Sequence, residues 1–139
     1  MPAPASMLAS LHSLLTGSSP ITDLVAARIY ASQAPQGAQL PTLIYHVIAA
    51  PTDHTHDGHG LSEAIIQFDI DATTPTSARA VADALANLID GKRLTQGATK
   101  FEAIFHDGNE FTSVEESLTQ GTTQTHRLTV HYRFLHQPA

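Results

Sequence analysis

The segment TDHTHDGHG, residues 52–60, concentrates side chains that are able to bind a metal ion. Imidazole nitrogens and carboxylate oxygens are suitable ligands for zinc or nickel. The glycines and threonines between them instead predict a turn without the rigid surroundings that a metal site needs. A metal site therefore competes with a solvated hairpin loop, and the flexible spacing favours the loop. The five side chains concerned are Asp53, His54, His56, Asp57 and His59.

A second group of interest is a pair of carboxylates two positions apart, Asp69 and Asp71. Alternate residues of a strand share a face, so the two could cooperate in acid–base chemistry. The alternative interpretation is a solvated strand face, or ion pairs with Arg127 or Arg133 on a neighbouring strand. We favour this alternative.

The other histidines form no recognisable catalytic or metal-binding pattern. They are spread over a predicted helix and several predicted strands, and the sequence contains no HExxH motif. It also lacks a G-x-S-x-G elbow, a G-x-x-x-x-G-K loop and a G-x-G-x-x-G turn. We therefore predict no catalytic residue, no cofactor and no metal site. These histidines are His12, His46, His106, His126, His131 and His136.

The composition is that of a folded, acidic chain. Of 139 residues, 42% are hydrophobic and 14% are charged, and the formal net charge is −6. The seven Lys and Arg residues form no basic stripe, so specific DNA binding is not expected. No cysteine is present, which excludes disulfides and thiolate chemistry. No apolar run reaches the roughly 18 residues of a membrane span, and we expect one soluble domain over residues 1–139.

Apolar periodicity predicts three helices. Residues 6–15 repeat leucine at helical spacing, and a Ser-Pro start predicts a short helix that follows. The most regular pattern runs over residues 75–90, after Thr74 as the N-cap. Its apolar stripe of Val81, Leu85 and Leu88 is expected to pack on the sheet.

Alternating apolar and polar residues predict the strands. Ile66, Phe68 and Ile70 face one side of a strand that forms a hairpin with its predecessor, with the histidine-rich segment at the tip. The element order predicts an α+β fold: an antiparallel sheet of four to five strands with helices packed on one face. The extended segments are residues 28–30, 42–50, 63–72, 99–106, 113–118 and 126–134.

Two stretches resemble the siphophage tail-terminator family, whose members are also called tail-completion proteins. In LVAARIYASQAPQGAQLPTLIYHVI, residues 24–48, an Arg-Ile-Tyr leads into an Ala-Pro loop and then a Leu-Pro that opens a strand. IIQFDIDA, residues 65–72, is similar to the Gln-x-Asp strand of that family. The resemblance extends over about residues 8–135.

The resemblance implies a structural virion protein and not an enzyme. Members form a hexameric ring on the last ring of the tail tube, stop its polymerisation and join the head connector. The expected partners are further copies of the chain, the tail tube protein and the head–tail connector or stopper, with no membrane. DNA is expected to pass through the lumen without specific binding. The expected location is the virion tail or neck, and the host cytoplasm during assembly.

Two alternatives stay open: another neck or tail component, such as a stopper or adaptor, and a small metal-binding module that uses the histidine-rich loop. For the structural hypotheses, the candidate interface combines exposed loops with arginines, which are enriched at interfaces. Intramolecular pairing with Asp69 or Asp71 is an equal alternative for the arginines. The candidate interface residues are Arg28, Tyr30, Pro35, Asp53, His54, His56, Asp57, His59, Arg127 and Arg133.

Overall fold

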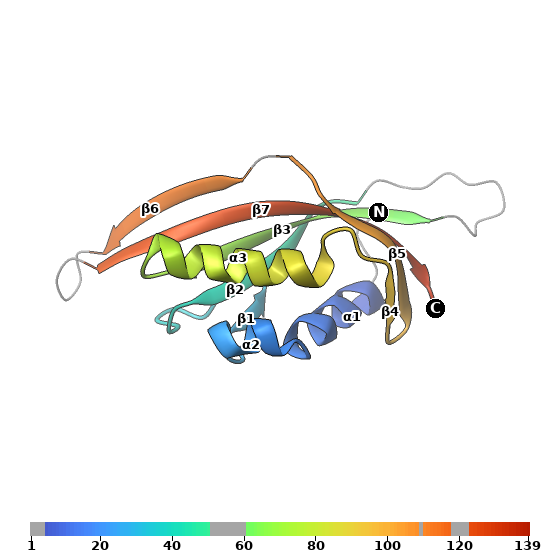
Figure 1. The fold of residues 1–139 in the computed structure, drawn as a ribbon, viewed down its shortest axis with the longest axis horizontal. Helices are drawn as coiled ribbons and strands as arrows, with labels where there is room; N and C mark the ends of the chain where they lie inside the picture. The colour runs from blue at the N-terminus through green and yellow to red at the C-terminus, as the bar shows by residue number, and fades with distance from the viewer. Residues whose placement is uncertain (1–4, 51–60, 109, 118–122) are drawn as a thin grey trace.

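A computed structural model describes residues 5–50, 61–108, 110–117 and 123–139. The chain forms a long curved sheet with helices beneath it (Figure 1). The elements in order are α1 (Ala5–Thr16), α2 (Ser19–Val25), β1 (Ile29–Ala31), β2 (Thr42–Ala49), β3 (Ser62–Ala72), α3 (Pro75–Ile89), β4 (Leu94–Gln96), β5 (Thr99–His106), β6 (Phe111–Ser117) and β7 (Thr123–Pro138).

The α+β class is confirmed, but the expected sheet of four to five antiparallel strands is wrong in two respects. The described residues form seven strands in the order β1-β2-β3-β7-β5-β4, with β6 also paired to β7. β1 runs parallel to β2, so the sheet is mixed. The extended segment expected at residues 28–30 corresponds to β1, whereas β4 was not expected. Both strands have three residues, too few for an alternating pattern to define them.

β7 is the central organising strand and has 16 residues, more than the predicted range of 126–134. β3 pairs along one of its sides over residues 126–136. On the other side, β5 pairs with the C-terminal part and β6 pairs with residues 123–129. We call β6 together with residues 123–129 the β6 arm. It reaches toward one end of the long axis of the molecule (Figure 1).

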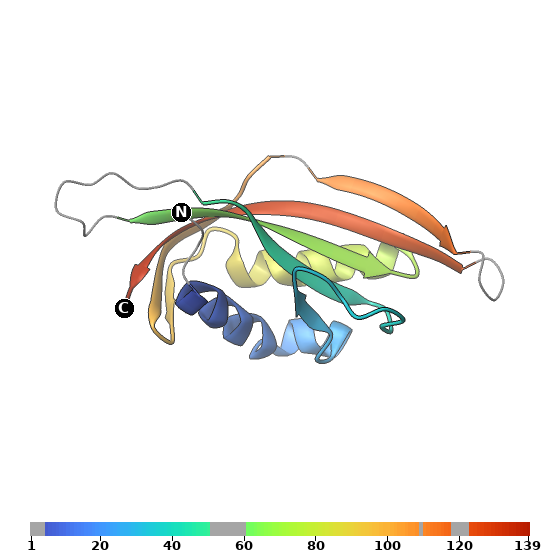
Figure 2. The same ribbon diagram turned by 180° about the vertical axis from the view of Figure 1, so that it is seen from behind.

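All three helices lie on one face of the sheet, as expected (Figures 1 and 2). α3 begins where the sequence predicts, because the Thr74 side chain accepts a hydrogen bond from the Ser77 amide at 3.1 Å and Pro75 occupies the first turn. Among the described residues, no helix is both long enough and apolar enough to cross a membrane.

The core lies between α3, α1 and the covered face of the sheet. Ile66, Phe68 and Ile70 are fully buried, which confirms the face assigned to them. Val81 and Leu85 of α3 belong to the same buried cluster, and Leu88 is partly buried at its margin. The predicted packing of this helix on the sheet is therefore confirmed, with Leu88 at the edge and not at the centre.

Candidate assembly surface

The face of the sheet opposite the helices carries a row of hydrogen-bonded side chains on β3 and β7, here called the polar ladder. These residues alternate with the buried ones, so they point away from the core. His131 Nε2 lies 3.0 Å from Gln67 Oε1, and the Phe111 ring of β6 lies 6.2 Å from the His131 ring. The rungs of the ladder are the register pairs Asp71–Arg127, Asp69–Thr129 and Gln67–His131.

Arg127 and the two aspartates form the strongest part of the ladder. Arg127 Nε and Nη2 donate to the two carboxylate oxygens of Asp71 at 2.7 and 2.9 Å. This forked hydrogen bond raises the pKa of Arg127. Asp69 is buried and accepts bonds from Thr129 Oγ1 at 2.7 Å and Gln67 Nε2 at 3.1 Å. Fixed donors thus hold both carboxylates, and the predicted ion pair with Arg127 is confirmed.

Arg133 differs from this prediction. Its guanidinium donates to the Glu63 carboxylate and lies 3.5 Å from Asp107 Oδ1. The expected pairing with Asp69 or Asp71 is wrong for Arg133, because the strand register places Ile65 opposite it. The sequence alone did not identify Glu63 and Asp107 as the partners of Arg133, because that pairing depends on the strand register and on the tertiary fold.

Three other predicted interface residues lie at the β1 edge of the sheet. Arg28 is half-buried, and its Nε donates to the Pro41 carbonyl at 3.0 Å, which joins the two ends of the loop over residues 31–41. Tyr30 is half-buried on β1, beside Ile44 of β2. Pro35 is exposed in the loop. The structure therefore places these three on β1 and the segments that flank it, and β2 and β3 separate β1 from β7 in the sheet order.

The histidine-rich segment cannot be placed on this surface. The predicted interface residues Asp53, His54, His56, Asp57 and His59 lie outside the described residues. Within the described ranges, no group of three or more His, Cys, Asp or Glu side chains is arranged to hold a metal ion.

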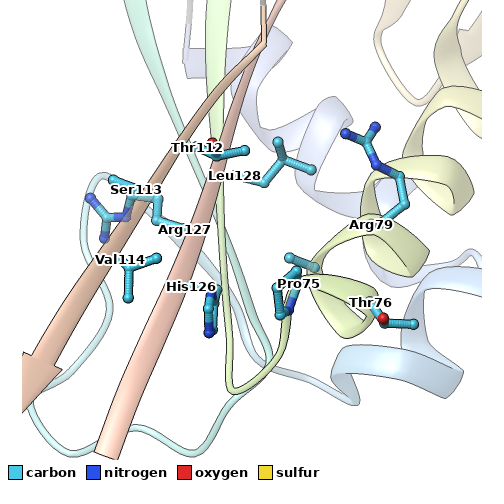
Figure 3. Close-up of a pocket in the computed structure, with 10 residues that line it drawn as sticks. Pro75, Thr76, Arg79, Thr112, Ser113, Val114, His126, Arg127 and Leu128 are labelled. Atoms are coloured by element: carbon cyan, nitrogen blue, oxygen red, sulfur yellow. The ribbon is translucent and has the colours of Figure 1, made fainter.

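The β6 arm provides a surface that the sequence did not indicate. Phe111 is 57% exposed and Val114 is 56% exposed, the two highest values among the large hydrophobic side chains described. A groove of about 550 Å³ lies between the arm and the first turns of α3, with Pro75 and Ala78 on one wall and Val114 and Leu128 on the other (Figure 3). The arm thus presents apolar surface on a strand that little else covers.

An ion pair connects the base of the arm to α3. Arg79 donates to both carboxylate oxygens of Glu110, at 3.0 and 2.7 Å, and also lines the groove. This bond raises the pKa of Arg79 and lowers the pKa of Glu110. Neither residue was singled out in the sequence, because the pair joins a helix to a strand 31 residues further along the chain.

Comparison with known families decides what kind of protein carries this surface. The sequence matches the family described as Tail completion protein gp17 over residues 9–137. The chain belongs to this family. The resemblance that the motifs indicated is therefore confirmed, and the chain is a member of a bacteriophage tail-completion family.

Solved structures also share the fold of this tail-completion chain. A chain from a structure titled "Virion of native gene transfer agent (GTA) particle" is 12% identical, with a TM-score of 0.60 and 93% of each chain covered. A second solved chain is 15% identical, with a TM-score of 0.50 and 92% of each chain covered. A search of the curated proteins finds no match. At these identities the likeness concerns the fold alone.

Proposed function

We propose that this chain is a structural protein of the phage virion that forms a ring, ends the tail tube and joins the tail to the head connector. The family match over residues 9–137 carries this proposal. The expected absence of catalysis belongs to the same proposal. Asp69 and Asp71, the best candidates for acid–base chemistry, are held by fixed donors in the polar ladder and support a structural role.

The arrangement of the surfaces supports a closed ring. In a ring, one patch of a subunit meets a different patch of its neighbour. The β1 edge with Arg28, Tyr30 and Pro35 is one candidate patch, and the surface around Arg133 is a candidate for the other. We expect six subunits in the ring. An acidic chain with a net charge of −6 would let DNA pass through the lumen without specific binding.

The decisive experiment removes the gene from a phage that encodes this chain and examines the products by electron microscopy. We expect tail tubes of uncontrolled length, or tails that fail to join heads, and restoration of normal particles when the intact gene is supplied in trans. Tails of normal length that remain unattached would instead indicate a stopper or adaptor. Normal tails on full heads would contradict any role in completing the tail.

The ring itself can be tested with purified protein. Native mass spectrometry is expected to show a closed oligomer, and a charge reversal at a ring contact, Arg28→Glu, is expected to shift it toward monomer. A matched control is Lys92→Glu, since Lys92 lies between α3 and β4, outside both candidate patches. A monomer for the unaltered protein at all concentrations would argue against self-assembly without partners.

A further inference from the structure

The free edge of β6 is the feature that the proposed ring does not use. β6 has seven residues and pairs only with β7 among the described strands. Residues 111–115 are all exposed. The outer edge of such a strand presents backbone N–H and C=O groups that have no partner within the sheet, which makes it a template for a further strand.

The two strands that end the sheet order, β1 and β4, are short. β1 and β4 have only three residues each. At β1, the backbone already bonds locally: the Ile29 amide donates to the Ala27 carbonyl at 2.9 Å, and the Gln33 amide donates to the Ala31 carbonyl at 2.8 Å. Short, locally bonded edges resist the addition of a strand. Among the described strands, β6 is therefore the edge best suited to accept one.

The two faces of β6 specify the chemistry of the added strand. On the helix side, Thr112 and Val114 continue rows that begin at Leu128 and His126, beside the apolar groove. On the opposite side, Ser113 and Glu115 border a shallow hollow of about 280 Å³ that Asp71 and Arg127 also line. Phe111 lies on this opposite side too, against the His131 ring at the start of β6. Opposite residues 112–115, an added strand would therefore carry apolar side chains on the helix side and polar ones on the other.

The negative charge of β6 favours basic residues on the polar side of the added strand. β6 itself has two glutamates and no cation. Two guanidiniums, those of Arg79 and Arg127, are already engaged by Glu110 and Asp71. A cation directly opposite Glu115 would form a favourable pair across the strands. Self-pairing of β6 from two copies would place two acidic strands side by side with no cation on either, so the charge opposes a second copy as the occupant.

We propose that the free edge of β6 is a docking site for an extended, basic segment of a different protein, in which apolar residues alternate with Lys or Arg. The backbone of that segment would bond to the edge of β6. Its apolar side chains would cover Val114 and its cations would face Glu115. This is strand addition, in which backbone bonds give affinity and alternate side chains give specificity. The inference rests on β6 and does not require ring closure.

A synthetic peptide tests this on the whole protein in its native oligomeric state. The probe is a capped heptapeptide that alternates lysine and valine, with a fluorescent label for anisotropy. Hydrogen–deuterium exchange with mass spectrometry is expected to show that it protects residues 111–117. A peptide that alternates glutamate and valine, and a lysine–valine peptide with alternate N-methylated amides, should not protect this segment.

Variants locate the contact. Glu115→Lys, at an exposed position, should weaken peptide binding roughly three- to tenfold, as expected when an attractive cross-strand pair becomes repulsive. The control Asp23→Lys reverses an exposed charge on α2 and should leave binding unchanged. No binding at millimolar peptide, equal binding of the glutamate peptide, or protection elsewhere would overturn the proposal.

A second copy in this position is also detectable. If residues 111–117 of the protein alone are protected and become exposed on dilution, another subunit occupies the edge and the proposal is wrong. Native mass spectrometry of the same samples reports ring formation separately. Failure of the ring and failure of the docking site can therefore be distinguished.

Discussion

The two ends of β7 differ in their side chains and in their surroundings. Residues 123–129 include a single apolar residue, Leu128, whereas the C-terminal part alternates apolar and polar residues. In the C-terminal part, Val130, Tyr132 and Phe134 are buried on the face that the helices cover, and Tyr132 and Phe134 lie between β3 and β5. In the β6 arm, the neighbouring strand leaves Phe111 and Val114 more than half exposed. Phe111 and Val114 are three positions apart and therefore lie on opposite faces of β6. Whether the apolar side chains of a strand are buried thus depends on what the rest of the chain places over each face.

The largest expected difference is in the free energy of unfolding lost when a buried and an exposed apolar side chain are each truncated. Leu85→Ala should lower the free energy of unfolding by about 2–5 kcal/mol, because Leu85 is fully buried between α3 and the sheet. Val114→Ala in the arm should change it by less than about 0.5 kcal/mol, because Val114 is 56% exposed. Urea denaturation followed by circular dichroism measures both.

These two substitutions test the comparison itself. A loss of less than about 0.5 kcal/mol for Leu85→Ala would show that α3 does not pack on the sheet as described. A loss near that of Leu85→Ala for the Val114 variant would show that the arm is covered in the folded protein, for example by another subunit. Measurement at two protein concentrations separates the latter case, since a contact between subunits depends on concentration.

The sequence predicted the buried part of the fold better than the exposed part. α3 and the β2–β3 pairing have strong periodicity, a cap at Thr74 and enough length, and all were found close to the predicted positions. β1 and β4 were not predicted as full members of the sheet, because three residues carry little periodicity. The parallel pairing of β1 with β2 depends on how the loop over residues 31–41 returns, which no local pattern records.

For the candidate surface too, the sequence predicted only those side-chain pairs that follow from the pattern of long strands. The pairing of Arg127 with Asp71 was among the predicted alternatives, since both residues lie on the polar side of long strands. The partners of Arg133 and the Arg79–Glu110 pair depend on strand register and on the approach of α3 to the arm. The groove beside Val114 likewise exists only in three dimensions.

The second prediction compares two arginines. Arg127→Met should cost about 1–3 kcal/mol, because it leaves the carboxylates of Asp69 and Asp71, 7% and 13% exposed, without their cation. Arg79→Met should cost at most about 1 kcal/mol, because Arg79 and Glu110 are 47% and 37% exposed and water screens the pair. Thermal and urea unfolding measure both losses.

A partner substitution checks the cause assigned to Arg127. Adding Asp71→Asn to the Arg127 variant should recover part of the stability, since one buried charge is then removed. If the double variant is less stable than Arg127→Met alone, the loss arises from packing of the long arginine stem and not from unpaired carboxylates.

The third prediction concerns His136, a buried histidine in the C-terminal part of β7. His136 is buried, its Nε2 has no partner among the described residues, and burial lowers its pKa from 6.5. The unfolded chain therefore takes up a proton at higher pH than the folded chain. As a result, this histidine lowers stability as pH falls from about 6.5 toward the pKa in the folded state.

Substitution should remove this contribution. The free energy of unfolding of His136→Leu should fall less steeply than that of the unaltered protein below pH 6.5. Parallel curves for the His136 variant and the unaltered protein from about pH 4.5 to about pH 7.5 would contradict the role assigned to burial.

The smallest effect is expected at the histidine-rich segment, which lies outside the described residues. Replacing His54, His56 and His59 together with Ser should change the free energy of unfolding by less than about 0.5 kcal/mol, because the sequence predicts a turn there and exposed turns tolerate polar exchange. Elemental analysis should find no stoichiometric zinc or nickel, and a chelator should not alter the melting temperature. A structural metal would behave differently, since its binding energy contributes directly to folding. Stoichiometric metal that disappears in the triple variant, together with a large loss of stability, would establish the metal-binding alternative.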